Sequence, residues 1–175
     1  MLLMLVLGGC ASDDDAPPPS PKASIFSATV ETCDPPEPSP PERPEFGRGT
    51  ALIETDDGSR LVNIEIAQTD EQRQFGLMFQ TEMAANAGMA FIFFEENVGG
   101  FYMKNTYLPL SIAYFDVDGK ILKIVDMEPC ETNSTLYDPG APYRGTLEVN
   151  QGQFEAWGVS KGDVINLVPA DTGGM

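Results

Sequence analysis

Arg60-Leu61-Val62-Asn63-Ile64-Glu65-Ile66 is the stretch that decides the fold class. Its β-branched apolar residues share one face and Asn63 and Glu65 share the other, which is the period of a half-buried β-strand. A second apolar run, Gly49–Glu54, precedes it. Asp56-Asp57-Gly58 between the two runs is typical of a tight hairpin turn. The sequence therefore predicts a pair of antiparallel strands here.

A short helix is predicted directly after this pair. Thr69-Asp70-Glu71-Gln72 matches a capping box, in which the first and fourth residues satisfy each other's backbone N–H groups. Phe75, Met78 and Phe79 follow at helical spacing. We expect an amphipathic helix over Asp70–Phe79.

The rest of the chain consists of short apolar runs broken by turn residues. These runs predict six further strands, over Met89–Phe94, Gly100–Met103, Leu110–Phe115, Lys120–Asp126, Tyr143–Val149 and Asp163–Val168, and a second short helix over Gln151–Trp157. No long alternation of strands and helices appears, so a doubly wound sheet is not expected. About eight short strands with two short helices indicate a mainly-β domain, a single sandwich or barrel.

The N-terminus carries a lipidation pattern. Leu7-Gly8-Gly9-Cys10 ends a short apolar stretch and resembles the lipobox of bacterial lipoproteins, in which the chain is cut before a cysteine that is then acylated. Residues 1–9 are accordingly predicted to be a signal peptide and Cys10 the lipidated residue. No Lys or Arg precedes Cys10, although export signals begin with positive charge. The alternative is a cytosolic protein with an apolar N-terminus and an incidental cysteine.

The region after Cys10 has the composition of a tether. Ten of the 15 prolines lie before Phe46, and apolar residues are sparse there. Such a segment cannot bury enough surface to offset the entropy of ordering it. We expect residues 10–46 to form a disordered, acidic linker and residues 47–175 to form the globular β domain.

The charge of the chain limits its partners. Ten Lys and Arg face 27 Asp and Glu, a net charge of −17. Nucleic acid is a poor partner for such a surface, and direct docking on anionic lipid is disfavoured. Membrane association is therefore expected through the lipid anchor on Cys10. In lipoproteins, Ala rather than Asp at the position of Ala11 implies the periplasmic face of the outer membrane.

Three cysteines and no histidine carry further information. If Cys10 is acylated, Cys33 and Cys130 remain, and an even remainder in an oxidising compartment suggests a disulfide. Two free thiols are the alternative. The absence of histidine excludes a Ser-His-Asp or Cys-His couple and an imidazole metal site. No metal and no cofactor are predicted.

The candidate site residues lie in two segments. Tyr102, Lys104 and Asn105 combine an aromatic ring, an ammonium group and an amide that together suit a carboxylate or phosphate ligand. Glu148 lies on a predicted strand beside Asn150, and inward-facing acids are costly unless paired. A Glu148–Lys104 pair lining a pocket is one hypothesis. The alternative is that Asn105 and Thr106 satisfy backbone groups at a strand end.

Several ordered blocks resemble the bacterial and archaeal family called domain of unknown function 192. They are Gly76-Leu77-Met78, Gly88-Met89 with Phe91 and Phe93, Met103-Lys104-Asn105-Thr106, Pro109-Leu110, Ile112–Asp116, Glu128-Pro129-Cys130, Leu147–Asn150 and Gly162-Asp163. The resemblance covers nearly the whole globular part and implies a compact, mostly β domain, often exported. It implies no activity. Ser111, Phe75 and Tyr102 depart from the family's usual Asp, Arg and Trp.

Three functions follow from these observations. The first is a non-catalytic envelope lipoprotein that binds a small ligand or partner protein through the face carrying Tyr102, Lys104, Asn105, Glu148 and Asn150. The second is a carboxylate-driven hydrolase of envelope glycans, with Glu148 and Asp116 or Asp126 as acid and base. The third is a structural or assembly role. The missing catalytic groups favour the first.

Overall fold

The alternating stretch forms the middle of a strand in the computed structural model, which describes residues 41–130 and 135–170. Strand β2 (Gly58–Ala67) pairs antiparallel with β1 (Gly47–Thr55), and the turn falls at the expected place. Val62, Ile64 and Ile66 are buried on one face. No helix in the described ranges is long and apolar enough to cross a membrane.

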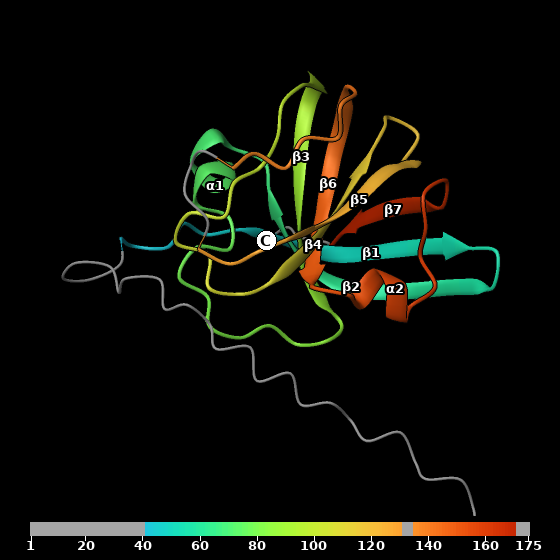
Figure 1. Cartoon of the computed structure of the whole chain (residues 1–175), viewed down its shortest axis with the longest axis horizontal. Helices are drawn as coiled ribbons and strands as arrows, with labels where there is room; N and C mark the ends of the chain where they lie inside the picture. The colour runs from blue at the N-terminus through green and yellow to red at the C-terminus, as the bar shows by residue number, and fades with distance from the viewer. Residues whose placement is uncertain (1–40, 131–134, 171–175) are drawn as a thin grey trace, which may run out of the picture.

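One mixed sheet holds all the named strands. The others are β3 (Ala87–Asn97), β4 (Leu110–Phe115), β5 (Ile121–Met127), β6 (Tyr143–Asn150) and β7 (Val164–Pro169). The order across the sheet is β5-β4-β6-β3-β2-β1-β7 (Figure 1). Every neighbouring pair is antiparallel except β2 and β3, which are parallel because helix α1 (Asp70–Phe75) carries the chain back between them. The predicted mainly-β fold with two short helices is confirmed.

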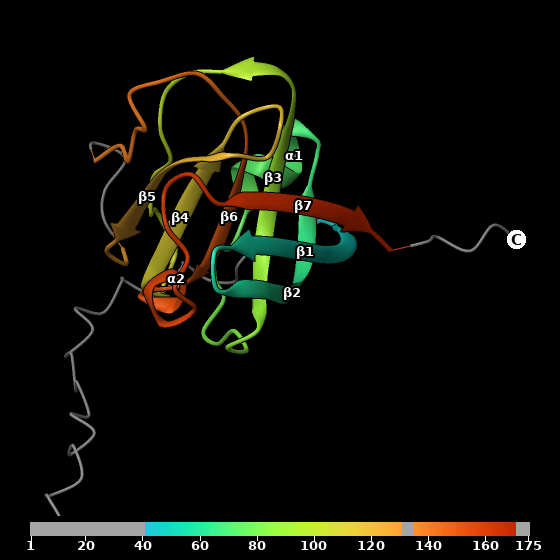
Figure 2. The same cartoon turned by 90° about the vertical axis from the view of Figure 1, so that its right-hand side faces the viewer.

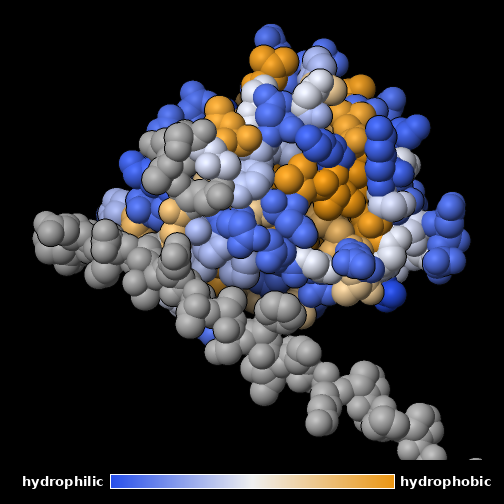
Figure 3. All heavy atoms as spheres, in the orientation of Figure 1, coloured by the Kyte–Doolittle hydropathy of each residue, from blue (hydrophilic) through white to orange (hydrophobic). Residues whose placement is uncertain are grey.

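The sheet curls until its two edge strands meet at one corner. Gly119, in the turn before β5, accepts a 2.8 Å hydrogen bond from the N–H of Ile165 in β7, and Lys120 bridges Val164. Beyond this corner the edges separate (Figure 2). Hydrophobic surface gathers over β5 and β7, where Ile124 and Leu167 only partly cover the core (Figure 3). The fold is therefore an open sheet that approaches a barrel without closing.

Residues Gly100–Met103 form no strand, contrary to the prediction. Only Phe101 makes a bridge, to Tyr137. Gly100 lies against the backbone of Tyr137, where a Cβ atom would come within 2.5 Å of the carbonyl oxygen. Gly99 precedes it with a φ of 97°. The two glycines let the chain turn there, so the described residues form seven strands rather than about eight.

The two faces of the sheet bury two hydrophobic clusters. Strand β4 is buried at every position and contributes to both: Ala113 and Phe115 to the first, Ile112 and Tyr114 to the second. Phe154 of helix α2 (Gln153–Ala156) closes the first cluster. Leu77, just after α1, closes the second. This second cluster forms the floor of the candidate site.

Both helices are shorter than predicted. Helix α1 ends at Phe75 rather than Phe79 because Gly76 adopts a φ of 49° and leaves the helical path. Helix α2 covers only Gln153–Ala156 of the expected Gln151–Trp157. The early end of α1 matters for the site, because it turns the chain from the helix into the cavity wall.

The capping box at α1 forms as predicted. The Thr69 hydroxyl accepts a hydrogen bond from Gln72 N (3.2 Å), and Gln72 Oε1 accepts one from Thr69 N (3.0 Å). We expect Thr69→Ala to lower the free energy of unfolding by about 1 kcal/mol. Urea unfolding measures this as a lower midpoint at unchanged slope. Thr69→Ser keeps the hydroxyl and is the control; an equal loss in both variants would contradict the cap as the cause.

Contacts with the domain begin before Gly47. The Arg43 guanidinium makes a two-pronged ion pair with Glu65, with hydrogen bonds of 3.1 and 2.5 Å, and lies over the ring of Phe46. The last residues of the predicted linker therefore pack on β2. The predicted signal peptide, Cys10 and the linker up to residue 40 lie outside the described residues.

Candidate functional site

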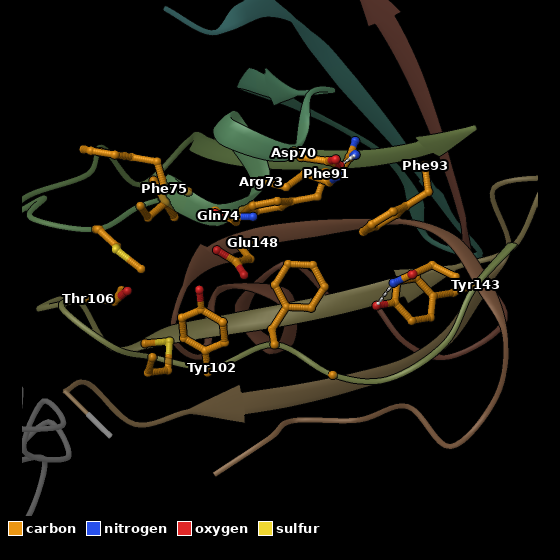
Figure 4. Close-up of a pocket in the computed structure, with 17 residues that line it drawn as sticks. Asp70, Arg73, Gln74, Phe75, Phe91, Phe93, Tyr102, Thr106, Tyr143 and Glu148 are labelled. Carbon is orange, nitrogen blue, oxygen red and sulfur yellow. Dashed lines mark hydrogen bonds and ion pairs between the residues drawn. The ribbon is translucent and has the colours of Figure 1, made fainter. Parts of the chain in front are cut away.

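A cavity of about 240 Å³ opens between helix α1, strands β3 and β6, and the segment from Gly100 to Thr106 (Figure 4). Its walls are largely aromatic, with the rings of Phe75, Phe91, Phe93, Phe101, Tyr102 and Tyr143. Its polar side chains are Asp70, Arg73, Gln74, Asn97, Thr106 and Glu148. The volume suits a small organic molecule.

Glu148 is the unusual group in this cavity. It lies on β6 between Met89 of β3 and Ile112 of β4, so its side chain belongs to the face of the second hydrophobic cluster. The residue is only 5% exposed. Within the described residues, no side chain or backbone group donates a hydrogen bond or an ion pair to its carboxyl group. Burial raises the pKa of Glu148 from 4.5 to about 8.

The aromatic rings around the cavity pack edge to face. Phe91 meets Phe101 with ring centroids 5.0 Å apart, Phe93 meets Tyr143 at 5.6 Å, and Tyr114 meets Tyr143 at 5.0 Å. Such pairs fix one another's rotamers and give a rigid wall. The wall is therefore formed before any ligand arrives.

The hydroxyl groups of the buried tyrosines already have hydrogen-bond partners. Tyr143 Oη accepts a 2.6 Å hydrogen bond from Asn97, and Tyr114 donates to the carbonyl of Tyr137. Burial raises the pKa of Tyr114 and of Tyr143, so both stay neutral. Neither phenol pairs with Glu148, whose carboxyl group makes no ion pair or hydrogen bond with a described residue.

Arg73 contributes the cavity's guanidinium group, but this group is committed elsewhere. It donates to the carbonyls of Ile92 (2.9 Å) and Gln68 (2.5 Å), and it pairs with Asp70. Its carbon lies 5.0 Å from the centre of the Phe93 ring. Arg73 thus ties α1 to β3 and does not neutralise Glu148.

The structure brings together two of the five predicted site residues. Tyr102 and Glu148 line the same cavity. Lys104 is exposed outside it, and Asn105 adopts a φ of 56° in a turn, where its carbonyl accepts from Phe79 N. The Asn150 side chain donates to the carbonyl of Met83 (2.9 Å). Asn105 and Asn150 thus hold loops in place, and none of the three residues lines the cavity.

The hypothesised Glu148–Lys104 pair does not form. The ion pairs among the described residues are Arg43–Glu65 and Arg73–Asp70. Lys104 lies in a turn outside the cavity, which the spacing of residues in the sequence does not reveal.

The other candidate acids lie away from Glu148. Asp116 closes the turn before β5 by accepting from the N–H groups of Asp118 (3.0 Å) and Lys120 (2.9 Å). Asp126 accepts from Ser111, which is on the opposite face of the sheet from Ile112 and Glu148. Neither Asp116 nor Asp126 lines the cavity. A two-carboxylate hydrolytic site built on Glu148 is therefore not assembled from them.

Sequence reasoning missed most of the cavity wall. Phe91 and Phe93 alternate with Ile92 along β3, so their shared face was readable from the strand pattern. Tyr143 and Asn97 come from distant parts of the chain and meet only through the pairing of β3 with β6. Only knowledge of the strand order places them in the same cavity wall as Glu148.

Cys130 is disulfide-bonded. The predicted partner, Cys33, lies outside the described residues. The pairing of these two cysteines stays a prediction.

Comparisons with known proteins give a family and a fold. The model of the DUF192 family, described as "Uncharacterized ACR", matches residues 52–167. A solved structure from Sinorhizobium meliloti, described as a candidate transcription regulator, is 31% identical with a TM-score of 0.68; the match covers 72% of this chain and 98% of that one. A protein of unknown function from Novosphingobium aromaticivorans is 25% identical with a TM-score of 0.66, covering 74% and 94%. No curated protein matches.

Proposed function

The chain belongs to the DUF192 family, which is uncharacterised, and we propose from the site itself that it is a non-catalytic binding domain of the cell envelope. Its ligand is a small organic molecule held in the cavity around Glu148 and Tyr102. One observation carries the proposal: a buried carboxyl group that has no partner in the described part of the chain faces an aromatic-lined cavity. Convergent polar groups in a preformed apolar pocket are typical of small-molecule sites.

Burying a carboxyl group without a partner destabilises a fold, so its presence calls for a compensating role. A ligand that pairs with Glu148 recovers the lost interaction. Perturbed acids inside a cleft are enriched at functional sites for this reason. A merely structural role would be served better by an apolar residue, as at the neighbouring positions Met89 and Ile112.

The composition of the cavity favours binding over hydrolysis. Glycoside hydrolysis generally uses two carboxyl groups about 5–10 Å apart on either side of the scissile bond. The other acid in the wall, Asp70, has an 88% exposed side chain and is paired with Arg73. The described wall therefore holds no second buried acid that could act with Glu148 as the acid–base pair of a hydrolase.

The solved relative described as a regulator suggests nucleic acid as another partner. A net charge of −17 argues against that role for this chain, because phosphate backbones require cationic surfaces. The lipobox-like Leu7–Cys10 segment and the disulfide at Cys130 support an envelope location instead, since disulfides persist in oxidising compartments. We propose membrane attachment through Cys10.

A thermal-shift screen of the full chain against small organic molecules tests the binding role. We expect hits that stabilise the fold by about 2.7 kcal/mol at a hundred times their dissociation constant. Tyr102→Ala removes part of the cavity wall and should weaken a hit about fivefold or more, the value of an aromatic contact. Lys104→Ala, two residues away but outside the cavity, is the matched control. A hit that depends on Lys104 and not on Tyr102 would contradict the assigned site.

A further inference from the structure

We propose that the ligand of this cavity is an organic cation, an ammonium group attached to a compact apolar body. The inference rests on the proposed binding role and adds the chemical class of the ligand. Three features of the cavity carry it: the charge of its polar groups, its aromatic walls, and the arrangement of its hydrogen-bond acceptors.

The described wall offers no counterion for the ionised form of Glu148. Glu148 has no partner among the described residues, and the guanidinium of Arg73 is held by Asp70 and two backbone carbonyls. No lysine is among the described residues that line the cavity. A cationic ligand supplies the counterion that lets Glu148 ionise, whereas an anionic ligand would find the Arg73 guanidinium already committed. The net charge of −17 also attracts cations to the surface from a distance.

The aromatic rings provide the second feature. Phe91, Phe93, Phe101, Tyr102 and Tyr143 line one cavity. Aromatic rings attract ammonium groups through their electron-rich faces, most strongly where water is excluded. The same rings offer apolar contact to the rest of the ligand. Arg73 already uses this attraction, since its guanidinium lies over Phe93.

The third feature is the placement of acceptors. The Tyr102 hydroxyl and the Gln74 amide point toward the same part of the cavity as the Glu148 carboxyl group (Figure 4). A primary ammonium group has three N–H donors. A carboxylate, a hydroxyl oxygen and an amide oxygen are three acceptors that match them. An alcohol of the same shape has one O–H donor, so it would satisfy fewer of these acceptors and would offer no positive charge to a carboxylate.

Binding of the cation should be linked to the release of one proton from Glu148. The titratable and charged groups that share the cavity or its wall with Glu148 are Asp70 and Arg73 from α1, Tyr102 from the loop, Tyr114 from β4 and Tyr143 from β6. Burial holds the pKa of Glu148 near 8, so its carboxyl group is mostly protonated at pH 7 in the empty cavity. An incoming ammonium group replaces that proton, which leaves to solvent. Affinity for the cation therefore rises between pH 6 and pH 8.

Three probes that share a ring but differ in charge test the inference on the full chain. They are benzylamine (a cation), benzyl alcohol (neutral) and benzoate (an anion), titrated by calorimetry at pH 7. We expect the amine to bind about tenfold or more tightly than the alcohol, the effect of a charge-assisted hydrogen bond in a buried site. Benzoate should bind more weakly than either. Titration in two buffers of different ionisation enthalpy should show release of most of one proton with the amine alone.

Glu148→Gln is the decisive variant, and Glu155→Gln on the exposed surface of α2 makes the same charge change away from the cavity. Glu148→Gln should remove the preference for the amine and the proton release while retaining the alcohol. Glu155→Gln should change neither. Equal or tighter binding of the alcohol to the unchanged chain would overturn the cation class and leave the binding role standing. Failure of both amine and alcohol to bind would count against the binding role itself.

Discussion

Glu148→Gln is expected to stabilise the folded protein on the order of 4 kcal/mol at pH 9 and to change it little at pH 5. The amide has nearly the same shape as the carboxyl group, so the packing against Met89 and Ile112 is retained. Only the charge is removed. The gain would be large compared with the total stability of a typical domain, about 5–15 kcal/mol.

The sign follows from the pKa of Glu148 in the two states. The folded value is about 8, above the unfolded value of 4.5. Between these values the folded chain holds a proton that the unfolded chain has released, so stability falls as pH rises through this window. The stability that this proton contributes to the folded state is fully present below about pH 4.5 and is lost above about pH 8. Glutamine carries no such proton, so this part of the pH dependence disappears in the variant.

Urea unfolding at pH 5, 7 and 9 measures the effect. The difference in free energy of unfolding between Glu148→Gln and the unchanged chain should grow with pH. Glu155→Gln again serves as the control, because its exposed carboxyl group lies on α2. A difference that is constant with pH would show that Glu148 ionises normally in the folded protein.

Local signals in the sequence predicted most of the fold. Alternation at Arg60–Ile66 and the capping box at Thr69 each depend on neighbouring residues, and both formed as expected. The predicted strand at Gly100–Met103 failed because its neighbour, Tyr137, touches it at a single bridge. Apolar composition indicated a strand, but no adjacent strand was present to complete the ladder.

The site was harder to predict for a related reason. Glu148 could be singled out as an acid on a predicted strand, but its burial could not be read from the pattern. The alternation that puts Asn63 and Glu65 on the face opposite their apolar neighbours would do the same for an acid between Leu147 and Val149. Its surroundings depend on β6 lying between β3 and β4, an order that hydrophobic patterns do not encode. The closeness of Lys104 to Tyr102 in sequence suggests that Lys104 lies near Glu148, but the turn at Asn105 directs the chain away. Pairings between strands that are distant in sequence therefore determine which side chains line the cavity.

The corner where the sheet edges meet supplies the second large effect. Gly119 adopts a φ of 79°, and a Cβ atom there would lie 2.3 Å from the carbonyl oxygen of Ile165. Gly140 has a φ of 77°, yet no heavy atom lies within 4 Å of its Cβ position. Alanine at either glycine carries the cost of a left-handed backbone, about 1–2 kcal/mol. Only Gly119→Ala also pushes β7 from the turn before β5.

We therefore expect Gly119→Ala to destabilise the fold by roughly 3–4 kcal/mol and Gly140→Ala by about 1 kcal/mol. The extra loss reflects the broken hydrogen bond from Ile165 N to Gly119 O and the exposure of Ile121 and Ile165, which are buried in the first cluster. Urea midpoints of the two variants measure the difference, and amide exchange at Ile165 should accelerate only in Gly119→Ala. Equal destabilisation would mean that backbone conformation alone accounts for the loss. The contact between the sheet edges would then contribute little to holding the open sheet in its curled form.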